Sequence, residues 1–567
     1  MMRARARRAA GIAALSAVAV VAVAVSRTDQ SLYSDPALQM KTVQQFLAGE
    51  SSRPNDWARP DYADLSRNAG EDLIVWAPGT PLAFLPFVRA GLTPAHAARA
   101  VAVLALVAGS AGWACWFARF DLPDTILFAF ALVVPWMRFA SNAMFLYTSE
   151  ILVFAIVPWI LAGALAVERA KRPALAGATA LGLAAGALYI VKYSATFVTA
   201  GVLVWFAWRA WRALTKKGVV PLFQVMPIEK GVRPLFSDPL LARRIGQLIA
   251  VTAGAAVPIA VLSRLNQQHG GAANLILATL GYGWRWDYIV DAVALPALSA
   301  ADLDSLLRFV LMHPVHGITH NAFWLSLAGL PGGVLLVVLA ARAHETSAAA
   351  ELARAVFGAS VAAILLVWTT SAVVSIESRH LASAGFAMLP LALAEGRAWW
   401  RDTSAPVRTL LGATACAFVL VPFAYGIVSV FAKTWRYPAG YRPAPSGIYN
   451  PLLAQHDAAS AAGALARDFD SSTDIWYLVD PLTALDLPGR AIVRHADFID
   501  PALLGRDRFL TSRRMRVHVV LPPRFEESGK GEAIRASFPQ ATSWSRRAIP
   551  GAEYVSWTAV LEPGDAQ

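Results

Sequence analysis

The sequence predicts an all-α membrane protein whose helices cross the bilayer many times, followed by a small α/β domain. Of its 567 residues, 56% are hydrophobic and only 16% are charged, and its mean hydropathy is +0.48. A soluble protein needs far more polar surface to cover its core. The apolar residues also fall into separate runs of about 17–25 residues, the length that a helix needs to cross the hydrocarbon layer.

About eleven apolar runs have this length or nearly so. The first covers about residues 11–25, and the others lie at about 95–117, 123–140, 147–167, 174–191, 194–211, 245–264, 321–342, 353–375, 380–395 and 406–431. Inside lipid, backbone polar groups must be satisfied within their own segment, so we expect these runs to be helices. The first run is also short enough for a cleaved signal peptide, but we expect a retained helix.

The positions of Lys and Arg predict which loops face the cytoplasm. They gather in the N-terminal arm and in three later segments, around residues 169–172, 212–244 and 397–408. All four fall on one side if every apolar run crosses the membrane. This predicts a multi-pass protein of the cell inner (plasma) membrane with a cytoplasmic N-terminus. It also accounts for the net charge of +12 without nucleic-acid binding, which needs a clustered basic face on a soluble domain.

We therefore divide the chain into a transmembrane module, residues 1–432, and an extracytoplasmic α/β domain, residues 433–567. The module has two long outer loops, at 27–78 and 265–320. In the α/β domain we expect strands at 474–480 and 516–523 and an amphipathic helix at 525–539. The two cysteines, Cys115 and Cys416, lie in apolar runs, which excludes a disulfide framework and a cysteine-based zinc site.

Three acidic positions lie close to predicted outer helix ends and are candidates for function, since charges near a bilayer are costly. Asp35 follows the first helix by about ten residues and could accept a proton from a hydroxyl, or simply start a helix. Asp72 precedes WAPGTPLAFLPF (76–87), whose prolines and glycine predict an irregular entry beside a pocket. Glu150 starts a helix, where it could bind substrate or compensate the helix dipole.

Lys and Arg are usually concentrated in cytoplasmic loops. Cations at outer helix ends are therefore unexpected, and they suit phosphate binding. Lys192 and Tyr193 lie between two helices, and Arg379 and His380 lie at the end of another. Anchoring to lipid headgroups is the alternative for these residues.

Three histidines in HPVHGITH (313–320) are spaced to share one helix face. His313, His316 and His320 are therefore candidate ligands of a divalent metal, although Pro314 and Gly317 weaken the helix. No phosphate-binding glycine loop, GxSxG or HExxH motif occurs, which argues against an ATP-driven pump.

Several motifs follow one another along residues 1–395. They are SDPALQMKTVQQFLAG with Asp35, WAPGTPLAFLPF, the pair Ser149–Glu150, VKYSATF with Lys192, and SRHLASAGFAMLPLALA with Arg379. In this order, on one predicted face, they resemble the GT-C superfamily of polytopic membrane glycosyltransferases, in the branch of protein mannosyltransferases and lipid A aminoarabinose transferases. The chain departs from the family pattern in two places, since Pro36 follows Asp35 where a double acid is common, and Ala77 replaces a proline.

The resemblance implies a donor sugar on a polyprenyl phosphate and a lipid, glycan or protein acceptor at the outer face. Asp35 would act as base, and Lys192, Arg379 and His380 would stabilise the leaving phosphate, with a divalent metal as another source of charge. Nothing else in the sequence implies a cofactor. Two alternatives remain: a transporter or flippase of envelope precursors, with binding charges near the midplane, and a non-catalytic envelope-assembly protein.

Overall fold

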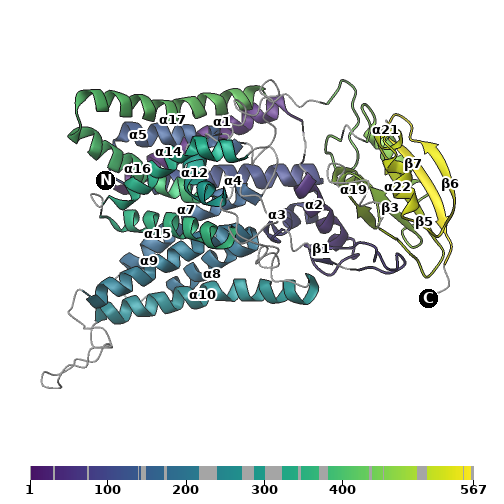
Figure 1. Ribbon diagram of the computed structural model, residues 1–567, viewed down its shortest axis with the longest axis horizontal. Helices are drawn as coiled ribbons and strands as arrows, with labels where there is room; N and C mark the ends of the chain where they lie inside the picture. Colours follow the sequence, from purple (N-terminus) through teal and green to yellow (C-terminus); the bar gives the residue numbers. More distant parts are fainter. Residues whose placement is uncertain are drawn as a thin grey trace, which may run out of the picture.

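The computed structural model consists of a long bundle of helices with a smaller α/β unit at one end (Figure 1). The structure describes residues 2–29, 32, 34–69, 71–72, 76–137, 140–141, 149–170, 175–215, 239–270, 287–300, 322–342, 346–368, 381–432, 437–450, 453–494, 507–552 and 554–563. We call the end of the bundle that carries the α/β unit the domain side, and the opposite end the far side.

The predicted apolar runs all overlap helices. The bundle contains α1 (Met2–Arg27), α4 (Pro94–Phe117), α5 (Asp124–Val133), α7 (Ser149–Arg169), α8 (Leu175–Val191), α9 (Thr196–Thr215), α10 (Pro239–Gly270), α12 (Asp287–Ala300), α14 (Ala322–Ala341), α15 (Ala348–Ala363), α16 (Ala382–Asp402) and α17 (Ala405–Ala432). Five helices in the described residues are long and apolar enough to cross a membrane, and several shorter ones are apolar. The number of eleven crossings therefore stays a prediction.

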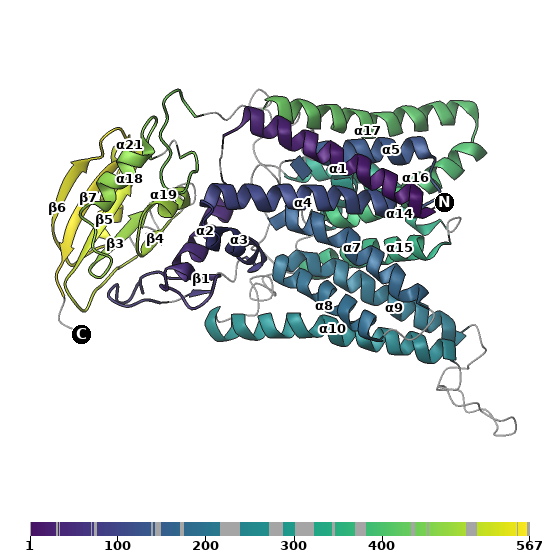
Figure 2. The same cartoon turned by 180° about the vertical axis from the view of Figure 1, so that it is seen from behind.

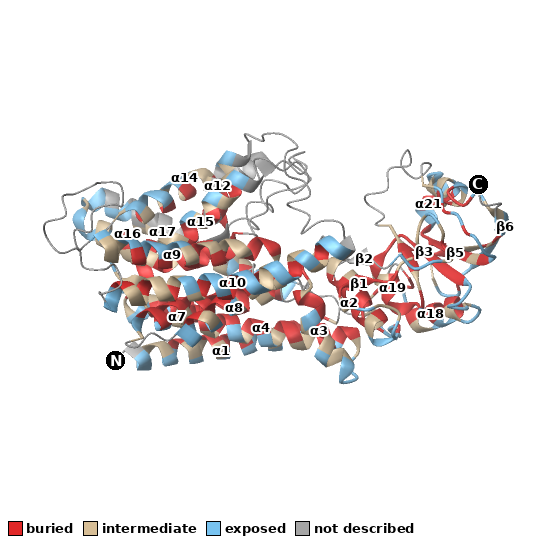
Figure 3. Ribbon diagram, turned by 90° about the horizontal axis from the view of Figure 1, so that it is seen from below, coloured by how far each residue is buried: buried red, intermediate tan, exposed pale blue. Residues whose placement is uncertain are grey.

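The bundle exposes large apolar side chains on its outside, as expected for helices that face lipid. Examples are Leu15, which is 73% exposed, Ile249, which is 63% exposed, and Leu104, which is 60% exposed. The opposite faces of these helices are buried (Figure 3). α1 packs along α4 and α5 with Ala9, Ala13 and other small residues fully buried, so it is an integral part of the bundle.

Helix α12 lies inside the stretch that the sequence assigns to the outer loop 265–320, so part of this stretch is helical, and its place on the outer side stays a prediction. α12 packs against α14 and α16. The contact is close because α14 presents glycines: a Cβ at Gly333 would lie 1.9 Å from the carbonyl oxygen of Val293. The apolar pattern does not predict this helix because two aspartates interrupt its apolar run, although 14 residues form more than three turns.

Acidic and basic side chains form a partly buried network on the far side. Glu168 of α7 pairs with Arg209 of α9 and, at 2.5 Å, with Arg244 of α10. Arg209 also pairs with Glu351 of α15 at 2.9 Å, and Glu351 pairs with Arg212. The network joins four helices. Arg212 and Arg244 belong to the segment 212–244 that the sequence assigns to the cytoplasm, and Arg209 lies next to it in α9.

The segment between α1 and α4 forms a compact cap on the domain side. It contains α2 (Ser34–Leu47), the short antiparallel strands β1 (Asp56–Trp57) and β2 (Glu71–Asp72), and α3 (Gly79–Arg89). The predicted loop 27–78 is therefore largely structured. The proline-rich stretch after Trp76 becomes α3, which packs against α2, α4, α7 and α8.

The α/β unit is built on one five-stranded sheet. Its elements are α18 (Ala458–Ala466), β3 (Asp474–Leu478), α19 (Pro481–Asp486), β4 (Ala491–Val493), β5 (Met515–Leu521), α21 (Pro523–Glu527), α22 (Lys530–Ala536), β6 (Ala541–Ala548) and β7 (Val555–Leu561). The strand order is β4-β3-β5-β7-β6, with parallel pairing among β4, β3 and β5 and antiparallel pairing beyond them. Both predicted strands are confirmed.

The predicted helix at 525–539 is wrong as a single element, since it is divided between α21 and α22. Gly529 stands at the break with a φ of 72°, a left-handed conformation that a glycine adopts at little cost.

The α/β unit is docked on the cap and on the bundle, as the back view also shows (Figure 2). The backbone N–H of Ala95, at the start of α4, donates to the carbonyl oxygen of Ser446 at 3.1 Å. Leu65 of the cap donates in the same way to Leu510 at 2.7 Å. Leu485 of α19 belongs to the same hydrophobic core as the bundle helices.

Candidate functional site

Two candidate residues, Glu150 and Lys192, form an ion pair on the domain side. α7 runs in the same direction as α4, which begins at the α/β unit, so the first turn of α7 places Glu150 on this side. Lys192 stands in extended conformation between α8 and a short 3-10 helix, and its Nζ donates to Oε1 of Glu150. Both side chains are largely buried, 5% exposed for Glu150 and 17% for Lys192.

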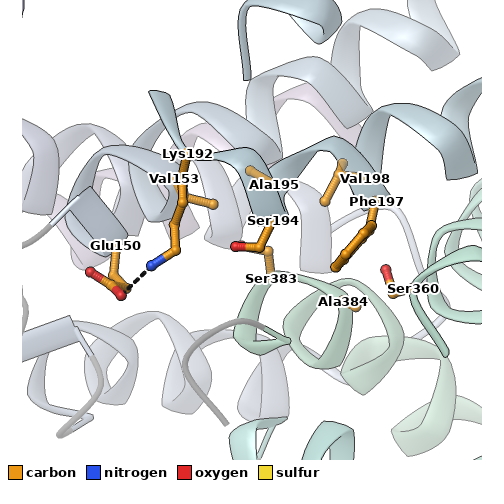
Figure 4. Close-up of a pocket in the computed structure, with 10 residues that line it drawn as sticks. All are labelled: Glu150, Val153, Lys192, Ser194, Ala195, Phe197, Val198, Ser360, Ser383 and Ala384. Atoms are coloured by element: carbon orange, nitrogen blue, oxygen red, sulfur yellow. Dashed lines mark hydrogen bonds and ion pairs between the residues drawn. The ribbon is translucent and has the colours of Figure 1, made fainter. Parts of the chain in front are cut away.

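The ion pair lines a small pocket whose enclosed space is about 10 Å³, room for about one water molecule. The lining residues come from α7, the turn after α8, α9, α15 and α16: Glu150, Val153, Lys192, Ser194, Ala195, Phe197, Val198, Ser360, Ser383 and Ala384 (Figure 4). The pocket therefore combines one ion pair, three hydroxyl groups and an apolar wall. Its charged and hydroxyl groups are placed to contact a polar group of a ligand at the mouth of the pocket.

Tyr193 follows Lys192 in sequence but is directed elsewhere. Its hydroxyl accepts a hydrogen bond from Nδ2 of Asn266 in α10 at 3.0 Å, and its ring centroid lies 5.0 Å from that of Tyr189. The residue is buried with Ala77 and Leu262 and is absent from the pocket lining. Its predicted role in substrate binding stays a prediction, and its contacts are those of an anchor between α8 and α10.

The turn that starts α3 determines how closely this segment approaches Lys192. A Cβ at Gly79 would lie 2.5 Å from Cα of Val191 and 2.8 Å from the carbonyl oxygen of Ile190. Glycine is therefore required here for close approach of two backbones, immediately before Lys192.

We expect Gly79→Ala to destabilise the protein by about 1–3 kcal/mol, because the backbone of α8 cannot move aside as a flexible side chain could. Thermal unfolding in detergent measures this. Gly358→Ala in α15 is the matched control, since a Cβ there meets nothing within 4 Å and alanine favours a helix. Equal melting temperatures for the two variants would contradict the close approach.

Asp35 and Asp72 lie in the cap. Asp35 is in the first turn of α2, where the sequence allowed for a helix start, and it is half-buried. Asp72 pairs with Asp56 across the two short strands, and its side chain is not among those described. Because α3 contacts α2 as well as α7 and α8, one short helix connects the element that carries Asp35 to the elements that carry Glu150 and Lys192.

The remaining candidates lie outside the described residues: Arg379, His380, His313, His316 and His320. Arg379 and His380 directly precede Leu381, and two of the next residues, Ser383 and Ala384, line the pocket. In the part of the chain that the structure describes, no group of three His, Cys, Asp or Glu side chains could hold a metal ion. The metal site stays a prediction.

The pocket hydroxyls were missed by sequence reasoning. Ser194, Ser360 and Ser383 come from three separate segments. A single serine in an apolar helix is common and needs no function, so only their convergence distinguishes them.

A second, shallow apolar pocket, which encloses no space for a water molecule, lies on the other side of the first turn of α7. It is lined by Thr80, Phe84, Ala98, Val101, Ala102, Ile151 and Leu152. Thr80 is 2% exposed, and its hydroxyl is buried without a hydrogen-bond partner. The two pockets flank the same turn, because Ile151 follows Glu150 directly.

No protein-family model and no curated protein matches the sequence. Solved structures do. ArnT from Cupriavidus metallidurans bound to undecaprenyl phosphate aligns with 97% of this chain and 99% of its own, with a TM-score of 0.50 and 11% sequence identity. The same protein in the apo state aligns with 97% of this chain and 98% of its own, at a TM-score of 0.46 and 12% identity. The chain thus shares the overall fold of this ArnT, in agreement with the fold that the resemblance of its motifs predicts.

Proposed function

We propose that this protein, which shares the fold of ArnT along its whole length, is a membrane glycosyltransferase that takes a sugar from a polyprenyl-phosphate donor. The main support is the fold, which aligns over 97% of the chain with an ArnT bound to undecaprenyl phosphate. The acceptor would be a lipid, glycan or protein of the cell envelope. The charge distribution supports an outer-face reaction, since the partly buried arginine network lies on the far side.

The pocket supports a role for Lys192 at the lipid phosphate. When the sugar leaves, negative charge grows on the phosphate oxygens, and a positioned cation stabilises that charge. Lys192 lies in the pocket, where Glu150 holds its ammonium in place before the donor arrives. Arg379 is four residues from Ser383, and a chain of this length spans at most about 14 Å, so we include Arg379 as a second candidate cation for the phosphate.

Asp35 would take the proton of the acceptor hydroxyl or orient it, from the first turn of α2. The proposed reaction requires no nucleotide.

The two other functions have less support. A transporter would place its binding charges near the middle of the bundle on broken helices, whereas the described ion pairs lie towards its two ends. A non-catalytic assembly protein would not need the Glu150–Lys192 pair to line a pocket.

The test is a transfer assay with purified protein in detergent. A panel of radiolabelled polyprenyl-phosphate sugars serves as donors, and a lipid and glycan extract of the envelope supplies acceptors. We expect label to move from one donor class to an acceptor in a manner that depends on protein concentration. Binding of a labelled donor without transfer to any acceptor would contradict the proposal and favour a transporter.

A further inference from the structure

Helix α2, which carries Asp35, lies between the bundle and the α/β unit. Its apolar residues Met40 and Val43 are fully buried in the core of the bundle. Thr42 and Gln45 bind other parts of the cap: Thr42 Oγ1 donates to Pro54 and Gln45 Nε2 donates to Ala58. One face of α2 packs against α19 of the α/β unit.

Lys41 of α2 makes a hydrogen bond to the α/β unit. It is 4% exposed, and its Nζ donates at 2.7 Å to the carbonyl oxygen of Leu487, the residue that follows α19. Leu487 is itself buried. A buried lysine loses the hydration of its ammonium and gains only one backbone hydrogen bond in return. A methionine of similar length would not pay this desolvation cost.

Two carboxylates compensate the buried ammonium. Burial lowers the pKa of Lys41 to about 8, while the charges of Glu50 and Asp486 act in the opposite direction. Asp486, the last residue of α19, is 7% exposed; its Oδ1 accepts the backbone N–H of Ser446 at 2.9 Å, and its Oδ2 is buried without a hydrogen-bond partner. Burial raises the pKa of Asp486 to about 6. Opposite charges from two units are therefore buried together at this contact.

We propose that Lys41 is a positioning residue through which the α/β unit fixes helix α2 and, with it, Asp35. The inference rests on the proposed function. Six residues separate Lys41 from Asp35, about 9 Å along a helix, so a shift of α2 at its contact with α19 moves the carboxylate as part of one rigid element. A misplacement of about 1 Å can reduce catalysis on the order of 100-fold.

The experiment compares Lys41→Met, Lys41→Arg and the wild type in the full-length protein in detergent. We expect Lys41→Met to lower kcat by about 10-fold or more and to change the KM for the donor by less than about 2-fold, because the donor pocket is lined by other elements. Lys41→Arg, which keeps a buried donor, should recover part of the loss. Lys530→Met in α22 is the control and should retain the wild-type kcat, since Lys530 contacts the ring of Phe525 far from α2.

A second measurement needs no activity. Amide hydrogen exchange of residues 34–47 should be at least about 10-fold faster in Lys41→Met than in the wild type, with exchange of α4 unchanged. A wild-type kcat in Lys41→Met would overturn the inference, whatever the exchange rates. A parallel rise in KM would also overturn it, because Lys41 would then act on donor binding. An inactive wild type with the expected change in exchange would overturn the proposed function and still support the anchoring of α2.

Discussion

Replacing Asp35 by asparagine is expected to lower the transfer rate by at least about 100-fold. A general base contributes on the order of 10²–10⁴-fold to a rate, and asparagine keeps the shape of the side chain but cannot accept the proton. The asparagine also remains a good residue for a helix start, so α2 should still form. The measurement is the initial rate of sugar transfer at saturating donor.

The matched control is Asp61→Asn in the same cap. Its carboxylate accepts a backbone N–H from Ala63 at 3.0 Å in a local turn, and it is expected to transfer at the wild-type rate. Loss of activity in both variants, with a lower melting temperature, would show that the cap is merely sensitive to charge removal. Full activity in Asp35→Asn would place the base elsewhere.

The bundle could be predicted from the sequence because one physical requirement dominates it. A helix that crosses lipid must be apolar for its full length, and the runs at 95–117 and 147–167 meet this requirement. A search for long apolar runs does not find α12, because Asp287 and Asp291 break its apolar pattern. The close contacts of Gly329 and Gly333 with α12 depend on tertiary packing, which a single sequence does not display.

Part of the site could be predicted because charges near a membrane are scarce. Glu150 and Lys192 attracted attention for this reason alone. Their pairing could not be predicted, since they are 42 positions apart and only the packing of α7 beside α8 brings them together. The proposed role of Lys41 could not be predicted either, because charged residues are common in a polar segment. Only the fold shows that Lys41 is buried and bound to Leu487, 446 positions later in the chain.

The separate substitutions Glu150→Gln and Lys192→Met are expected to have the second-largest effects. Each leaves one charge of a largely buried pair without its partner, which costs about 3–5 kcal/mol of stability. Lys192→Met should also lower kcat by about 100-fold, because it removes a cation aimed at the growing phosphate charge. Thermal unfolding and transfer kinetics are measured on the same preparations.

The double variant separates stability from chemistry. Removing both charges leaves no unpaired charge, so Glu150→Gln/Lys192→Met should regain most of the melting temperature that either single variant loses. Its kcat should stay as low as that of Lys192→Met, since the cation is still missing.

The pair Arg354–Glu395, at 3.2 Å on the far side, provides the comparison. Arg354→Met should lower the melting temperature and leave the kcat of the folded fraction unchanged. If the double variant regained both transfer and stability, the Glu150–Lys192 pair would only stabilise the packing of α7 against α8. The phosphate would then be bound by other residues, and Arg379, which precedes the pocket residues of α16, would be the first to replace.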